Sequence, residues 1–204
     1  MSDSDNWKES LVRSLGRARR FFSNSGKFER ECWVAKTFLR RLGINVEPHE
    51  LERADEPVDV LVREARFQIK EAMPPGRKRQ LEYSIKLSEA EAAKRRADLL
   101  KTYTPIEMRG QEIFNICSSY AEKLVSENAY GPKEISNIDL LVYVNYPGNH
   151  EFEPYEGRLS ASPFRSVSYL SNRYASVIFA APSAVEWLKD QIGVVSDMLP
   201  YEED

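Results

Sequence analysis

The sequence is poor in cysteine and histidine, and it contains no long apolar run. Its two cysteines, Cys32 and Cys117, form no CxxC pair, so we expect free thiols in a reducing compartment. The two histidines, His49 and His150, stand far apart, and a zinc site therefore has little support. No stretch approaches the ~20 consecutive apolar residues that span a bilayer. We therefore expect a cytoplasmic protein that does not associate with membranes.

Charge of one sign is not in large excess either. The formal net charge is −3, with 29 Lys and Arg against 32 Asp and Glu, which does not mark a nucleic-acid binder. The charges are clustered, however: basic residues gather at 13–20, 77–79 and 94–96, and acidic residues at 47–59 and 201–204. A local basic face can bind phosphate even on a mildly acidic protein.

Hydrophobic periodicity predicts an α/β fold. Apolar residues at spacings of three and four indicate helices, and β-branched or aromatic runs between turn signals indicate strands. Gly43 suits the C-terminal cap of one helix, while Ser88 and Thr104 suit the start of two others. The expected helices are 6–22, 28–42, 88–101, 104–127 and 183–193, and the expected strands are 44–46, 58–62, 65–69, 138–146, 167–170 and 174–180.

These elements predict one core with appendages, as a length of 204 residues suggests. We expect a mixed sheet with helices packed on it. The run at 138–146 lacks alternation, which is typical of a strand buried on both faces. We divide the chain into a basic amphipathic helix (1–26), a core (27–146), and a C-terminal hairpin and helix on the same domain (147–204). Residues 149–163 are expected to form a long loop.

The stretch 57–71 carries the strongest chemical signal. Asp59 stands near the start of one predicted strand, and Gln68 and Lys70 lie on the next, so a hairpin would gather them at one end of the sheet. Mg²⁺ binds hard oxygens, and Asp59, the Gln68 amide and the Ile69 carbonyl are candidate ligands. Such an ion activates water and neutralises phosphate charge. Lys70 would hold the attacking water or the scissile phosphate.

This pattern resembles the PD-(D/E)XK nuclease superfamily. Asp59-x8-Gln68-Ile-Lys70, with Pro57 two residues before the aspartate, is similar to the Mrr-type restriction endonucleases, in which Gln-x-Lys replaces Glu-x-Lys. The resemblance implies a restriction-endonuclease-like αβββαβ core and a DNA endonuclease that depends on Mg²⁺ or Mn²⁺. The chain as a whole also resembles a small bacterial family described only as candidate endonucleases.

The resemblance further implies a glutamate on the helix before the sheet. Residues 30–43 are similar to the family's first helix, which also ends in Leu-Gly, and the match places the glutamate on Glu31. Glu29 is a rival, but Glu31 lies seven residues before Phe38 and so borders the inward apolar stripe. On this match Glu31 would support the metal or its water, beside Asp59.

A nucleic-acid partner would need a basic surface near the site. Arg77, Lys78 and Arg79 follow the candidate site directly and would grip the DNA backbone. Members of the resembled superfamily often dimerise to cut both strands, and the apolar C-terminal hairpin could serve a homodimer. Two alternatives stay open. Because Gln68 leaves one fewer negative charge for the metal, the chain could bind DNA without hydrolysing it. It could also be a protein-interaction adaptor without nucleic-acid activity.

Overall fold

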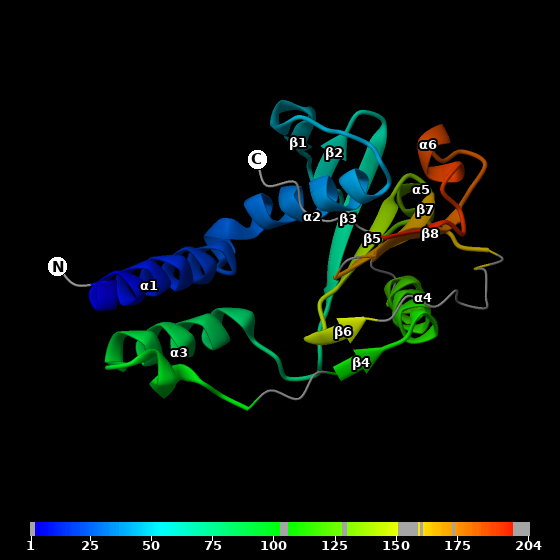
Figure 1. Ribbon diagram of the computed structural model, residues 1–204. Coiled ribbons are helices and arrows are strands. Elements are labelled where there is room, and N and C mark those ends of the chain that lie inside the picture. Colours follow the sequence, from blue (N-terminus) through cyan, green and yellow to red (C-terminus); the bar gives the residue numbers. More distant parts are fainter. Residues whose placement is uncertain are drawn as a thin grey trace. The chain divides into compact units, whose positions relative to one another are not determined.

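The computed structural model describes residues 3–102, 106–127, 130–150, 159, 161–172 and 174–197. The chain forms two compact units, one from residues 1–30 and 74–104, the other from residues 31–73 and 105–204. The first unit is helical, and the second is built around a sheet (Figure 1). Helix α2 (Lys27–Arg41) contributes to both. The domain boundaries suggested by the sequence, after residues 26 and 146, stay predictions.

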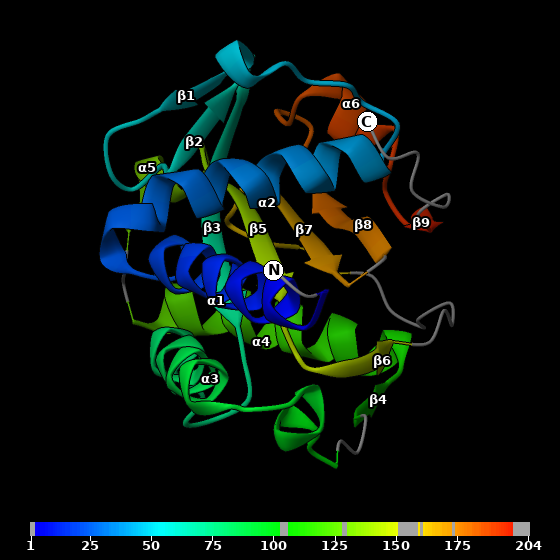
Figure 2. The same ribbon diagram turned by 60° about the vertical axis from the view of Figure 1, so that its left-hand side comes forward.

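In the first unit, α1 (Asp3–Phe21) packs along α3 (Arg79–Ala92), as Figure 2 shows. Phe22 stacks on Tyr83 with 5.0 Å between ring centroids. The amphipathic helix predicted at 6–22 is confirmed. Leu11, Leu15 and Ala18 are half-buried while Arg13 and Arg17 are exposed, so we infer that the apolar side of α1 meets α3. Two short 3-10 helices complete the unit, η1 (Asn24–Gly26) and η3 (Arg96–Leu99).

The helix predicted at 88–101 is wrong in its position. α3 begins at Arg79 and ends at Ala92, so Ser88 lies inside it and caps nothing. Tyr83, Leu87 and Ala90 follow one another at spacings of four and three, and Leu87 and Ala90 are buried. This apolar stripe runs through the residue that the capping pattern marked as a start, and burial of the stripe decides where the helix lies.

The second unit holds a seven-stranded sheet of order β1-β2-β3-β5-β7-β8-β9. The first three strands form an antiparallel meander, β3, β5 and β7 are parallel, and β8 and β9 continue antiparallel. Helices lie on both faces, so the expected α/β fold with a mixed sheet is confirmed. β4 pairs separately with β6. The strands are β1 (Leu51–Arg53), β2 (Val60–Val62), β3 (Ala65–Ala72), β4 (Ile106–Met108), β5 (Asp139–Val144), β6 (Gly148–His150), β7 (Ser166–Ser171), β8 (Tyr174–Ala180) and β9 (Val195–Asp197).

One face of this sheet is covered by α4 (Gly110–Ser126). Leu140 and Val142 of β5 share a buried core with Ile113 and Cys117 of α4. Side chains alternate between faces along a strand, so the even-numbered residues of β5 face α4. Residues of β3 that pair with them in parallel register share that face.

The opposite face is covered by α2. Phe38 of α2 lies edge-on against Phe67 of β3, with 5.9 Å between ring centroids, and Trp33 lies against Tyr143 of β5 at 5.7 Å. Odd-numbered residues of β3 and β5 therefore face α2. The unit also contains the short helices η2 (Pro48–Glu50), α5 (Pro132–Ile135) and α6 (Glu186–Lys189).

A strand predicted at 44–46 is wrong. Gly43 has a φ of +77° and ends α2, as expected. The Ile44 N–H then donates to the Leu39 carbonyl at 2.9 Å, so Ile44 closes the helix end instead of joining the sheet. The first strand of the meander is β1, which pairs with β2.

The later elements follow the sequence prediction more closely. β7 and β8 confirm the hairpin at 167–170 and 174–180, and β5 confirms the buried strand at 138–146. The helix predicted at 104–127 begins only at Gly110, because residues 106–108 pair with β6 instead. The last helix, predicted at 183–193, is shortened to α6.

Three further expectations concern thiols, membranes and a loop. Both cysteines are free; Cys117 is buried and Cys32 is half-buried. Burial raises the pKa of each thiol, and the Glu31 charge raises that of Cys32 further, against the effect of Arg53. Among the described residues, no helix is both long and apolar enough to cross a bilayer. Most of the loop predicted at 149–163 lies outside the described residues.

Candidate functional site

The hairpin of β2 and β3 brings Asp59 and Gln68 into direct contact. The Asp59 N–H donates to the Phe67 carbonyl at 2.9 Å, which places Asp59 opposite Gln68. Gln68 Nε2 donates to Asp59 Oδ2, and the Ile69 N–H donates to the same oxygen at 2.8 Å. Both side chains are buried, at 8% and 5% exposure. A buried carboxylate is thus held in place by an amide and a backbone N–H, as buried polar groups require.

Lys70 lies on the same face of the sheet. It follows Gln68 by two residues and pairs with Val142, whose side chain faces α4. The side chain is half-buried, and within the described part of the chain its Nζ makes no hydrogen bond or ion pair. The sheet therefore presents a carboxylate, an amide and an ammonium group on one face.

Glu31 lies on the helix that covers the other face. It is 8% exposed, whereas Glu29 is exposed, so burial favours Glu31 as the inward-facing residue. Glu31 precedes Phe38 by seven residues and shares its side of α2, the side that contacts Phe67. The sheet thus brings Asp59, Gln68 and Lys70 together, while Glu31 approaches it from the opposite face. Its role as metal support stays a prediction.

A cavity of about 430 Å³ adjoins the Asp59 end of the hairpin. Residues 53–58, which lead into Asp59, form one wall, and Glu134 and Asn137 form another. Leu61 contributes from β2, and by alternation it shares the sheet face of Asp59. The cavity therefore opens on the face that carries the predicted site. Its charged lining residues are Arg53, Asp55, Glu56, Arg66 and Glu134.

Tyr130 lies close enough to Asp59 and to two carboxylates of the cavity lining to feel their charges. Its ring packs edge-on against Phe164, with 6.2 Å between centroids. Burial raises the pKa of the Tyr130 hydroxyl, and the nearby charges of Asp59, Glu134 and Glu56 raise it further. Sequence reasoning did not group these residues, because Glu56 and Asp59 lie far along the chain from Tyr130 and Glu134.

The donor set of this site fits a hard divalent ion only in part. No group of three or more His, Cys, Asp or Glu side chains is arranged to hold a metal, as far as the described residues go. Asp59 supplies one carboxylate, and the Gln68 amide already donates to it. Mg²⁺ commonly binds through one or two carboxylates, with waters and substrate phosphates completing its shell. Asp59 and Gln68 would therefore supply only part of the shell of such an ion, and waters and a substrate phosphate would have to supply the rest.

Asp139 is a buried acid that sequence reasoning missed. Its side chain is fully buried and accepts hydrogen bonds from the Arg66 N–H at 2.8 Å, from Ser166 Oγ at 2.8 Å and from the Arg165 guanidinium. Arg165 also donates to the Glu64 carbonyl at 2.8 Å. This network ties the turn of the β2–β3 hairpin to β5 and β7. An aspartate at the start of an apolar strand was the signal that could have revealed it.

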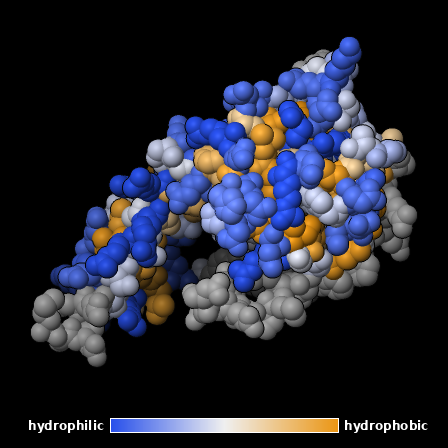
Figure 3. All heavy atoms as spheres, turned by 90° about the horizontal axis from the view of Figure 1, so that it is seen from above, coloured by the Kyte–Doolittle hydropathy of each residue, from blue (hydrophilic) through white to orange (hydrophobic). Residues whose placement is uncertain are grey.

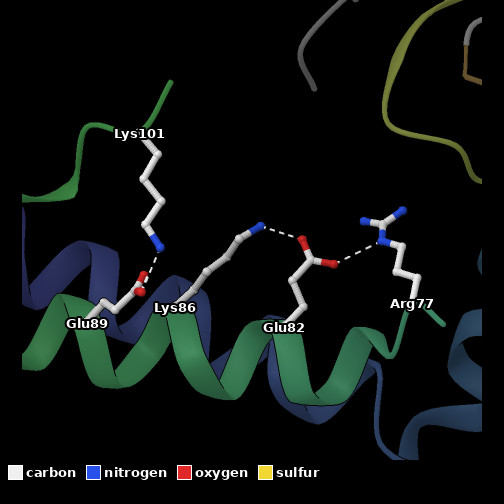
Figure 4. A network of polar contacts seen from close by, with 5 residues as sticks. All are labelled: Arg77, Glu82, Lys86, Glu89 and Lys101. Atoms are coloured by element: carbon white, nitrogen blue, oxygen red, sulfur yellow. Dashed lines mark hydrogen bonds and ion pairs between the residues drawn. The ribbon is translucent and has the colours of Figure 1, made fainter. Parts of the chain in front are cut away.

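The basic turn Arg77–Arg79 lies in the first unit. Arg77 Nε pairs with Glu82 at 3.0 Å, and Glu82 also holds Lys86 (Figure 4). The Arg79 guanidinium lies over the Phe22 ring, 3.4 Å from its centroid. Lys78 is exposed at the start of α3. Two of these three cations therefore have partners within their own unit, and their predicted grip on DNA stays a prediction.

The chain belongs to a protein family. Residues 3–199 match the model of the family described as "Putative endonuclease, protein of unknown function (DUF1780)". No curated protein matches the chain. A similar solved structure is that of the protein of unknown function PA4535 from Pseudomonas aeruginosa strain PAO1, whose title adds "Monooxygenase Superfamily". It is 21% identical, with a TM-score of 0.60 and 97% of each chain covered, so the likeness concerns the fold alone.

Proposed function

We propose that this member of the endonuclease-named family is a metal-dependent endonuclease that hydrolyses DNA phosphodiester bonds at Asp59, Gln68 and Lys70. The observation that carries the proposal is their convergence: Gln68 bonds to Asp59, and an ammonium without an ion-pair partner among the described residues lies on the same sheet face. The chain order α2, β1, β2, β3 and the parallel pairing of β5 with β3 support a PD-(D/E)XK-like core, although α3 and β4 are inserted between β3 and α4. The family description supports the reaction class.

Asp59 would hold Mg²⁺ or Mn²⁺, with the amide oxygen of Gln68 and the carbonyl of Ile69 as further ligands. Bound there, the ion supplies Lewis acidity and a water of lowered pKa. Lys70 stabilises the charge that develops on the phosphate oxygens and orients the attacking water. Glu31 lies on α2 at the opposite face of the sheet, so we do not count it among the proposed metal ligands. The C-terminal hairpin would serve a homodimer that cuts both strands.

The decisive experiment is cleavage of supercoiled plasmid in Mg²⁺ and in Mn²⁺. We expect Lys70→Ala to reduce the rate at least ~10²-fold, as removal of one charge-stabilising group commonly does. Asp59→Asn should reduce it as strongly and should also abolish metal binding measured by titration calorimetry. Glu29→Gln, a change at an exposed site, should leave the rate unaltered. Cleavage that persists in Lys70→Ala would rule out this site.

One observation favours a second function, DNA binding without hydrolysis. The amide nitrogen of Gln68 faces Asp59, so a single carboxylate serves the metal. This function predicts that the wild-type chain binds DNA but cleaves it in neither Mg²⁺ nor Mn²⁺, and that Gln68→Glu gains cleavage. That result would mean that the protein binds DNA but lacks the second carboxylate that hydrolysis needs. A chain that binds neither metal nor nucleic acid would instead fit an interaction or adaptor protein.

A further inference from the structure

The two units carry opposite charge. Residues 1–30 and 74–104 contain 15 Lys and Arg against 8 Asp and Glu, and the rest of the chain contains 14 against 24. The first unit therefore carries a formal charge of +7 and the second −10, which together give the modest −3 of the whole chain. The near-neutral total hides a strongly basic helical unit.

Most cations of that unit have partners within it. Arg77 and Lys86 pair with Glu82, and Lys101 pairs with Glu89 at 2.6 Å (Figure 4). Such cations are partly neutralised by their neighbours. Five other cations of the unit also have partners. Lys8 and Arg30 donate to backbone carbonyls, Arg95 pairs with Asp98, and Arg79 and Arg96 lie over the rings of Phe22 and Trp7.

Four arginines of α1 differ from these. Arg13, Arg17, Arg19 and Arg20 are all exposed, and within the described ranges their side chains make neither hydrogen bonds nor ion pairs. No acidic residue occurs between positions 10 and 28. Hydrophilic side chains predominate on the part of the surface that α1 forms (Figure 3). These cations are therefore open to an anionic partner.

The spacing makes a stripe of three. Arg13, Arg17 and Arg20 lie four and three residues apart, which places them on one side of the helix. At 1.5 Å rise per residue they span about 10 Å. A DNA strand carries one phosphate per ~3.4 Å of axis, so the stripe matches about three phosphates.

Helix stability explains only part of this stripe. Arg19 and Arg20 stand in the last turn, where cations favour the helix dipole. Arg13 and Arg17 lie before it, beyond the reach of that effect, so a dipole role leaves them unexplained. A surface that collects unpaired guanidinium groups along one helix face is typical of phosphate recognition.

We propose that this arginine stripe, Arg13, Arg17 and Arg20, binds the phosphate backbone of duplex DNA without sequence preference. The choice of DNA rests on the proposed function; the openness of the stripe to a polyanion does not. An anionic membrane fits less well, because the apolar side of α1 is turned onto α3, where Phe22 stacks on Tyr83. Binding in a bilayer interface needs that apolar side free.

The test measures the salt dependence of binding to a fluorescein-labelled 20-bp duplex by anisotropy. We expect the triple change Arg13→Gln, Arg17→Gln and Arg20→Gln to weaken binding at least ~10-fold at low salt. The slope of log K against log[KCl] should fall by ~2–3, at about 0.9 per lost phosphate contact. The matched control removes three paired cations of the same unit, through Lys86→Gln, Arg95→Gln and Lys101→Gln. It should lower the slope by less than ~1.

An equal loss of DNA affinity in the two triple variants would overturn the proposal for the arginine stripe, because net charge alone would then explain binding. An unaltered slope in the α1 variant would overturn it too. So would an α1 variant that loses binding to phosphatidylserine vesicles but keeps the wild-type affinity for the duplex. Circular dichroism confirms that each variant is folded. The two proposals fail separately. Binding through the stripe without any cleavage sinks the nuclease alone, whereas Lys70-dependent cleavage with intact DNA affinity in the α1 variant sinks the stripe alone.

Discussion

The two units of this chain handle charge in opposite ways. In the sheet unit the decisive polar groups are buried and satisfy one another, as with Asp59 and Gln68 or Asp139 and Arg165. In the helical unit many charged groups are exposed, and they pair with one another or lie open to solvent. Buried pairs fix geometry and tolerate little change, whereas exposed pairs contribute little to stability and are exchangeable.

This difference suits a division of labour. The proposed catalytic site would need side chains held within tight limits, and the buried contacts of the sheet would hold them. The proposed DNA-binding stripe would need charge without fixed partners, and the arginines of α1 would supply it. This contrast between the units can be tested by substitutions that break the buried network and by substitutions that remove exposed ion pairs.

The largest effect is expected at Asp139. Asp139→Asn should lower the free energy of unfolding by about 3–5 kcal/mol, because it leaves Arg165, whose side chain is 11% exposed, as a buried charge without its counterion. Urea unfolding followed by circular dichroism measures the change. Glu82→Gln in the helical unit, which removes a similar number of charged contacts at the surface, should cost less than ~1 kcal/mol.

The double change Asp139→Leu with Arg165→Met sharpens this test. Replacing both members of a buried pair by apolar residues is often neutral or stabilising, so the double variant should recover most of the lost stability. If the single and double variants are equally unstable, the network acts through something other than paired charge.

How far the sequence predicts this structure depends on the range of the interaction. Asp59, Gln68 and Lys70 were found because a hairpin is local and strand alternation fixes which residues share a face. Asp139 was missed, since its partners include the turn of that hairpin, about 70 residues away in the chain. The face from which Glu31 approaches was equally hidden, because it depends on which side of the sheet α2 packs. The start of α3 was predicted wrongly at Ser88, because the local capping pattern there is outweighed by burial of the apolar stripe of α3.

A second prediction concerns one rigid point in the otherwise adaptable helical unit. A Cβ added to Gly26 would lie 2.5 Å from the Phe21 carbonyl oxygen and 2.7 Å from that of Arg20. Gly26→Ala should therefore cost about 1–3 kcal/mol, since backbone must move. Gly16→Ala is the matched control: nothing lies within 4 Å of its added Cβ, and the helix should gain up to ~1 kcal/mol. Thermal unfolding followed by circular dichroism measures both changes: the midpoint should fall in Gly26→Ala and rise in Gly16→Ala.

A third prediction uses the hydroxyl of Tyr130 as a reporter on the site. Its pKa is raised above the usual 10, so the protonated form is favoured in the folded state. The stabilising contribution is present in full below pH ~10 and is lost as the pH rises through the raised pKa. Titration at 295 nm, as the difference between wild type and Tyr130→Phe, measures it. Asp59→Asn should move the Tyr130 pKa down towards its usual value; an unaltered titration would mean that Asp59 and Tyr130 are not neighbours.

The smallest effect is expected from an exposed ion pair. Lys101 and Glu89 are 2.6 Å apart, but their side chains are 67% and 37% exposed, so water and salt screen their attraction. Glu89→Gln should alter the free energy of unfolding by less than ~0.5 kcal/mol, and the difference should vanish in 1 M KCl. The same urea titration as for Asp139→Asn measures it. A loss near 2 kcal/mol would erase the contrast between the units, because surface charge in the helices would then be as fixed as buried charge in the sheet. It would also disqualify Lys101 from the control set for the arginine stripe.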